Sequence, residues 1–93
     1  MNKITIKQLQ AVVDRINRIA GTPMVSYVNG DDGKFHSQPN NFHLDFAYGG
    51  VQLVQMCNEG GGTRNITQGH VPKRELFDLM QAFIAGMETK VKS

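Results

Sequence analysis

The residues whose chemistry suits catalysis or metal binding are few: three histidines, Asp45 and the single cysteine, Cys57. His43 and Asp45 stand two apart in a stretch that alternates like a strand, so we expect them to point to the same side, as half of a metal site or a His–Asp pair would. No HExxH, CxxC or second nearby histidine completes such a site, because His36 and His70 lie in other segments. The sequence therefore predicts no metal, no cofactor and no catalytic residue, and it favours hydrogen bonding on a solvated sheet face.

Cys57 and the glycine run at residues 60–62 have simpler interpretations than catalysis. A lone cysteine on an apolar strand is more often a small core residue than a nucleophile. Because one cysteine excludes an internal disulfide, we expect a reducing, cytoplasmic setting. The glycine run exposes N–H groups, yet no Gly-Lys-Ser/Thr follows and a strand comes next, so we interpret it as a turn that needs positive φ angles.

The composition describes a single domain, residues 1–93, with a formal net charge of +2. This charge argues against a DNA mimic, which needs dense carboxylates, and against a strong non-specific DNA binder. At this size one modest core forms, with little left for a deep active site. No apolar stretch reaches the roughly 18 residues of a membrane span. We expect a soluble, cytoplasmic protein with no membrane contact.

Amphipathic patterns predict a helix near each end of the chain. Thr5 to Ala20 opens with a capping box between Thr5 and Gln8, and its apolar residues recur at three- and four-residue spacing. A second stripe follows Pro72, whose missing N–H suits the first helical position, and it runs to about Thr89.

Between the helices the pattern becomes that of strands. Met24 to Val28 is predicted as a strand followed by a turn, and Lys34 to Asn41, interrupted by Pro39, as an edge strand or an irregular arm. In residues 42–47 apolar Phe42, Leu44 and Phe46 alternate with other residues, which indicates a strand with one buried face.

The last two predicted strands complete an antiparallel sheet. Val51 to Cys57 is apolar on both faces and is expected to be the central strand. Thr63 to Thr67 is polar and suits a sheet edge. The expected fold is α+β, with a helix, a three- or four-stranded antiparallel sheet and a helix, both helices lying on one face of the sheet.

Basic residues form two small groups. Lys73 and Arg74 stand at the start of the second helix, where the helix dipole disfavours cations, so an anion or an acidic partner is a candidate reason for them. Arg15 and Arg18 make a modest basic face on the first helix. The helix, three strands, helix order resembles double-stranded RNA-binding domains and implies direct binding of RNA or DNA that weakens with salt. A solvated helix start is the plainer alternative.

Several motifs resemble a family of small bacteriophage and prophage proteins. They are residues 4–17 (ITIKQLQAVVDRIN), NFHLD at 41–45, AYGG at 47–50, NEGGG at 58–62 and PKREL at 72–76. The likeness spans most of the chain and extends to anti-CRISPR proteins that act on type I CRISPR-Cas surveillance complexes. It implies a non-catalytic inhibitor that binds the Cas protein and guide-RNA complex of the bacterial host and blocks recognition of target DNA.

The residues expected to bind this partner have the arginine, aromatic or loop character common in interfaces; they are Tyr48, Asn58, Glu59, Arg64, Lys73 and Arg74. This expectation includes contact with the guide RNA. The alternative function is a small nucleic-acid-binding module that uses Arg15, Arg18, Lys73 and Arg74. We expect a monomer, with a homodimer through the polar edge strand as the alternative.

Overall fold

The first helix begins and ends where the local sequence predicts. A computed structural model describes residues 3–92, with side chains described through residue 89. α1 spans Ile6–Ala20, after a capping box in which the Thr5 hydroxyl accepts the Gln8 N–H and the Gln8 side chain accepts the Thr5 N–H. It ends at Gly21 in the left-handed conformation, φ 71°, which glycine adopts without strain. The capping-box prediction is confirmed.

The strands form two separate antiparallel sheets. The main sheet contains β3 (Phe42–Ala47), β4 (Gly50–Met56) and β5 (Thr63–Asn65) in that order, so the predicted central strand does lie in the centre. β1 (Tyr27–Asn29) and β2 (Phe35–Ser37) pair only with each other. The predicted α+β class and the order along the chain, a helix, antiparallel strands and a second helix, are therefore confirmed.

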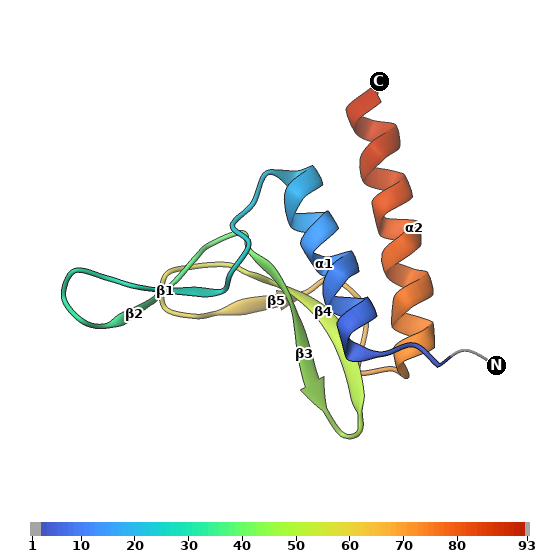
Figure 1. Cartoon of the computed structure of the whole chain (residues 1–93), viewed down its shortest axis with the longest axis horizontal. Coiled ribbons are helices and arrows are strands. Elements are labelled where there is room, and N and C mark those ends of the chain that lie inside the picture. Colours follow the sequence, from blue (N-terminus) through green and yellow to red (C-terminus); the bar gives the residue numbers. More distant parts are fainter. Residues whose placement is uncertain (1–2, 93) are drawn as a thin grey trace.

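The hairpin of β1, β2 and their turn, residues 27–37, projects from the rest of the molecule, and we call it the arm (Figure 1). The sequence placed the strand at Met24 to Val28, but the strand observed is Tyr27–Asn29 and it does not join the main sheet. One cause is Asn40, whose φ of 76° bends the chain between β2 and β3. The stretch from Lys34 to Asn41 is the arm's second strand and the bend that follows it.

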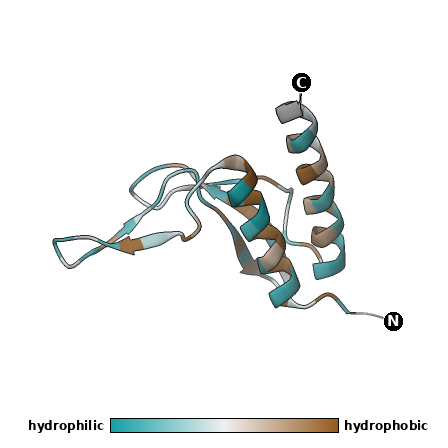
Figure 2. Cartoon of the chain, turned by 45° about the horizontal axis from the view of Figure 1, so that its top comes forward, coloured by the Kyte–Doolittle hydropathy of each residue, from teal (hydrophilic) through white to brown (hydrophobic). Residues whose placement is uncertain are grey.

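The core joins both helices to the main sheet. α2 spans Lys73–Lys92, so Pro72 stands just before the helix and not at its first position. The core includes Phe42, Val51 and Leu53 of the sheet, packed with apolar residues from both helices: Leu9, Val13, Ile16, Leu76, Met80 and Ile84. Figure 2 shows the hydrophobic colouring of the helices facing this interior. Neither helix in the described part of the chain combines the length and apolar character required to cross a lipid bilayer.

The two ends of β4 differ from what the sequence pattern predicts. Cys57 lies just after β4 and is exposed, so its predicted place in the core is wrong. The reason is that the strand ends at Met56, and the Cys57 N–H then donates to the Gly62 carbonyl to close the loop. At the other end of β4, the β3–β4 hairpin extends past the start of α1 (Figure 1).

A basic groove at the start of both helices

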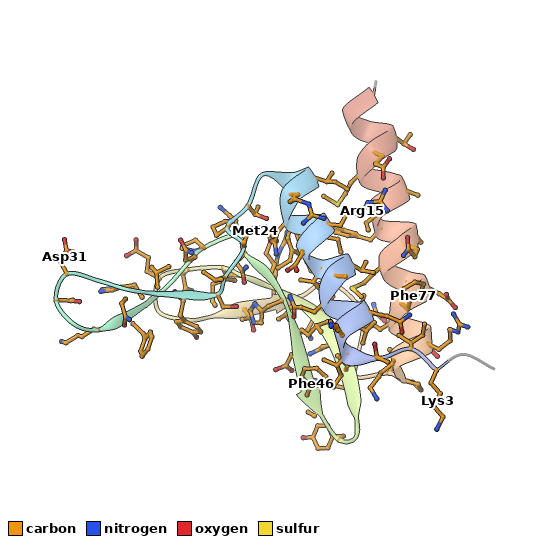
Figure 3. The ribbon with its side chains drawn as sticks, in the orientation of Figure 1. Lys3, Arg15, Met24, Asp31, Phe46 and Phe77 are labelled. Carbon is orange, nitrogen blue, oxygen red and sulfur yellow. The ribbon has the colours of Figure 1, made fainter. Side chains whose placement is uncertain are left out.

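An open groove of about 800 Å³ lies where α1 and α2 begin, beside the β3–β4 turn, and we call it the basic groove. Its floor is apolar and comes from three parts of the chain: Ile4, Ile6, Phe46, Ala47, Val51 and Val71. Its rim carries Lys3, Lys73 and Arg74, and the lining in the described part of the chain contains no Asp or Glu. Figure 3 shows Lys3 and Phe46 at this end of the molecule.

The floor of the groove exposes large apolar side chains. Ile6 is 51% exposed and Phe46 is 52% exposed. The alternation of residues 42–47 predicts that Phe46 shares the buried face with Phe42, and the register confirms that both lie on the face of Val51 and Leu53. Phe46 is nevertheless exposed because the hairpin extends past the beginning of the helix that covers Phe42. The length of the strand relative to the helices creates this surface.

The electrostatics of the groove favour a negatively charged occupant. Among the described residues the ion pairs are those of Arg15, His36 and His70, so the three rim cations have none. Both helices begin at the groove, and a helix N-terminus carries partial positive charge from its backbone N–H groups. Placing Lys73 and Arg74 there costs about 0.3 to 1 kcal/mol each, which an anionic group would offset.

A backbone clamp holds the start of α2 against the sheet. Val51 and Val71 exchange both backbone hydrogen bonds, at 2.9 and 3.0 Å. A Cβ at Gly50 would lie 2.8 Å from the backbone carbon of His70, so only glycine allows this approach. Gly50, the last residue of the AYGG block at 47–50, therefore has a structural role. It lets the segment before α2 pack close to the hairpin.

A His–Asp pair reinforces this clamp from the opposite face of the sheet. His70 Nε2 lies 2.8 Å from Asp45 Oδ2, and this hydrogen bond lowers the pKa of Asp45. Tyr48, with φ 53° and a fully exposed ring, contacts the His70 ring edge to face at a centroid distance of 6.0 Å. Asp45 thus pairs with a histidine from the segment before α2, and not with His43.

The remaining polar groups on that face form hydrogen bonds with one another, except for one buried amide oxygen. His43 Nδ1 lies 3.1 Å from Asn41 Oδ1, and burial lowers the pKa of His43 below 6.5. The Gln52 amide donates to Asn65 Oδ1 at 3.2 Å, while Gln52 Oε1 is buried without a partner among the described residues. No three His, Cys, Asp or Glu side chains in the described part gather closely enough to hold a metal ion.

The predicted partner-binding residues divide between two ends of β4. Tyr48, Lys73 and Arg74 lie beside or on the basic groove. Asn58, Glu59 and Arg64 lie near the other end of this seven-residue strand, about 20 Å away along it. They do not form one surface with the groove residues.

Two residues of this distant group have structural roles. Asn58 Oδ1 accepts the N–H groups of Gly60 and Gly62, at 2.9 and 3.0 Å, and so shapes the NEGGG loop. The Arg64 guanidinium donates to Gln55 Oε1 at 2.9 and 2.6 Å across the β4–β5 pair. Glu59 is exposed in the same loop.

The four residues of the nucleic-acid alternative are also separated. Arg15 pairs with Glu88 at 3.0 Å, beside the distal part of α2 (Figure 3). Glu88 is 15 positions beyond Lys73, which is about 22 Å along the helix. Arg18 is exposed in the last turn of α1, away from the end where the groove lies. One continuous basic patch of these four residues is therefore absent from the described surface.

Comparison with known proteins identifies no relative of this chain. No family model matches the chain, and no curated protein or solved structure matches it significantly. Sequence reasoning missed Lys3, Ile6 and Phe46, which the fold brings beside Lys73 and Arg74. The only sequence signal for the site was the unfavourable placement of two cations at a helix start.

Proposed function

We propose that this protein acts by binding and without catalysis, and that the basic groove receives a segment of a partner protein that presents carboxylates beside apolar side chains. The observation that carries the proposal is the combination of an exposed apolar floor with three rim cations that form no ion pair with any described residue. Phosphate groups alone would pair with the cations and leave Ile6 and Phe46 uncovered. A protein segment satisfies both parts of the groove.

The resemblance to small phage proteins extends the proposal to the identity of the partner. We infer that the partner is a subunit of the Cas protein and guide-RNA complex of a type I system, encountered in the cytoplasm of the bacterial host. Binding there blocks recognition of target DNA by occupying a surface and requires no chemical step. The groove supports the binding mode, and the motif resemblance alone supports this choice of partner.

The test is an affinity pull-down from a lysate that contains a type I complex, with and without nuclease. The wild type is compared with Lys73→Glu/Arg74→Glu and with the control Arg18→Glu. The double variant keeps its fold because Glu in the first turn of a helix is favoured by the dipole. Losing an arginine hot spot costs 2 kcal/mol or more, so we expect the double variant to bind at least about 30-fold more weakly.

The outcomes separate the two functions. Stoichiometric Cas subunits that survive nuclease treatment, are lost with the double variant and are kept with Arg18→Glu would support the proposal. Cas subunits bound equally by all three proteins would remove the groove from the interface. Recovery of nucleic acid that nuclease abolishes would replace the proposal with the second candidate.

That second candidate is a nucleic-acid-binding module, which one observation favours. The helix, three-stranded antiparallel sheet, helix order places Lys73, Arg74 and the exposed Tyr48 together at one end. It predicts affinity for free RNA or DNA that falls steeply with salt, and a smaller salt slope for Lys73→Glu. It also predicts that Arg18→Glu weakens binding, whereas the protein-binding proposal predicts no effect.

A further inference from the structure

The arm and the segment that leads into it, residues 24–37, carry most of the exposed large apolar side chains of the described chain. Of nine such residues, three lie on the arm, Tyr27, Val28 and Phe35, and Met24 and Val25 lie just before it. Phe35 is 73% exposed, and Figure 2 shows a hydrophobic stretch on the arm away from the helices. A two-stranded hairpin alone in water is marginally stable, so a surface of this kind gains stability when another surface covers it.

Among the described residues, the contacts that hold the arm to the rest of the molecule lie at its base. The Ser37 hydroxyl donates to the Asn58 carbonyl at 2.7 Å, and Tyr27 lies against the loop at Gly61. Toward the tip, Asp32 pairs with His36 within the arm itself. The side chain of Asp31, beside it, has no hydrogen bond or ion pair with the described residues. The tip therefore presents the Asp31 carboxylate near exposed apolar side chains. Asp32 and Lys34 are exposed in the same turn and have opposite charges, so with His36 neutral the tip has a formal charge of −1.

These are the properties that the basic groove requires of its occupant. The groove has an apolar floor with Ile6 and Phe46 half exposed and a rim with no acidic residue. The arm and the groove lie at opposite ends of a molecule 47 Å long, as Asp31 and Lys3 show in Figure 3. The arm cannot reach the groove of its own chain, and only a second copy can bring the two surfaces together.

We propose that the protein self-associates by inserting the arm of one copy into the basic groove of a second. In a two-fold dimer each copy inserts its arm into the basic groove of the other. The same contact then forms twice, and both grooves are occupied. This arrangement differs from the monomer expected from the sequence and from a dimer formed through β5. The inference rests on the proposed function in one respect, since a partner that binds the groove must displace the arm.

The test uses complementary charge reversals on the full chain. Asp31→Lys makes the arm tip basic, and Lys73→Glu/Arg74→Glu makes the groove rim acidic. Each variant alone sets like charges against each other, so sedimentation equilibrium should give the monomer mass at concentrations where the wild type is dimeric. An equimolar mixture restores opposite charges at both contacts and should regain the dimer mass. Asp78→Lys and Arg18→Glu serve as matched controls that should leave the wild-type dimer intact.

A second variant covers the case in which a charge change disturbs the hairpin turn. Phe35→Ser removes the most exposed apolar side chain of the arm and should also give monomers, with an unchanged circular dichroism spectrum. A wild type that stays monomeric up to submillimolar concentration would overturn the inference. A dimer that persists in both charge variants, or single variants that fail to reassociate when mixed, would overturn it as well.

These results are independent of the pull-down. A monomeric protein that still captures Cas subunits through the groove would overturn self-association and leave the proposed function standing. A dimer with the expected charge dependence that captures no partner would support self-association and overturn the proposed function. If both hold, Asp31→Lys should bind the partner more tightly than the wild type, because the competing arm no longer occupies the groove.

Discussion

Phe42 and Phe46 provide a direct test of how the groove arises, because they are the same residue on the same face of the same strand. Phe42 is 6% exposed and packs edge to face on Phe83 at a centroid distance of 5.8 Å. Phe42→Ala should cost about 3 to 5 kcal/mol in the free energy of unfolding, as buried Phe to Ala changes do. This is a large part of the roughly 5 to 15 kcal/mol of a typical domain.

Phe46→Ala should affect stability far less. Full burial of a side chain of this size contributes about 1.5 to 3 kcal/mol, and Phe46 is 52% exposed, so its removal should cost about 1 kcal/mol. It borders an open groove, so truncation leaves no closed cavity. Its effect should appear in association, with at least a tenfold loss of affinity if it is an aromatic anchor of the interface.

Urea unfolding followed by circular dichroism measures the loss of stability, and sedimentation equilibrium measures the loss of association. With a slope of about 1 kcal/mol per molar urea, Phe46→Ala should shift the midpoint by about 1 M and Phe42→Ala by several molar. Equal losses of stability would refute the placement of Phe46 at an open surface. Unchanged association of Phe46→Ala would refute the groove as an interface.

The other predictions concern the fold and its response to pH. Asn17→Ala should cost about 2 to 5 kcal/mol in urea unfolding, because the buried Asn17 amide holds both the N–H and the carbonyl of Phe42 and two buried groups would lose their partners; a cost below 1 kcal/mol would contradict this role. Burial lowers the pKa of His43, so the unfolded chain takes up a proton at this residue at a higher pH than the folded protein does. The free energy of unfolding is therefore highest above pH 6.5 and declines as the pH falls toward the pKa of His43 in the folded protein. The urea midpoint should therefore drop less between pH 7 and 5 in His43→Asn than in the wild type, and equal drops would count against this cause.

Local pattern was sufficient for the elements whose signals involve residues close in sequence. The capping box at Thr5 and the alternation of residues 42–47 each describe contacts within a few positions. Such signals report which face of an element is apolar and where it begins. They predicted the α+β order, the central position of β4 and the shared face of His43 and Asp45.

Tertiary structure decided where those faces meet and where they are left uncovered. Phe46 belongs to the buried face by pattern and is exposed because the hairpin extends past the helices. Asp45 pairs with His70, 25 positions away, a contact that depends on how the segment before α2 returns to the sheet. The sequence by itself determined the two helices, the strands of the main sheet and the apolar face of β3. The relative lengths and register of elements far apart in the chain determined the basic groove, because those quantities are set only when the elements pack together.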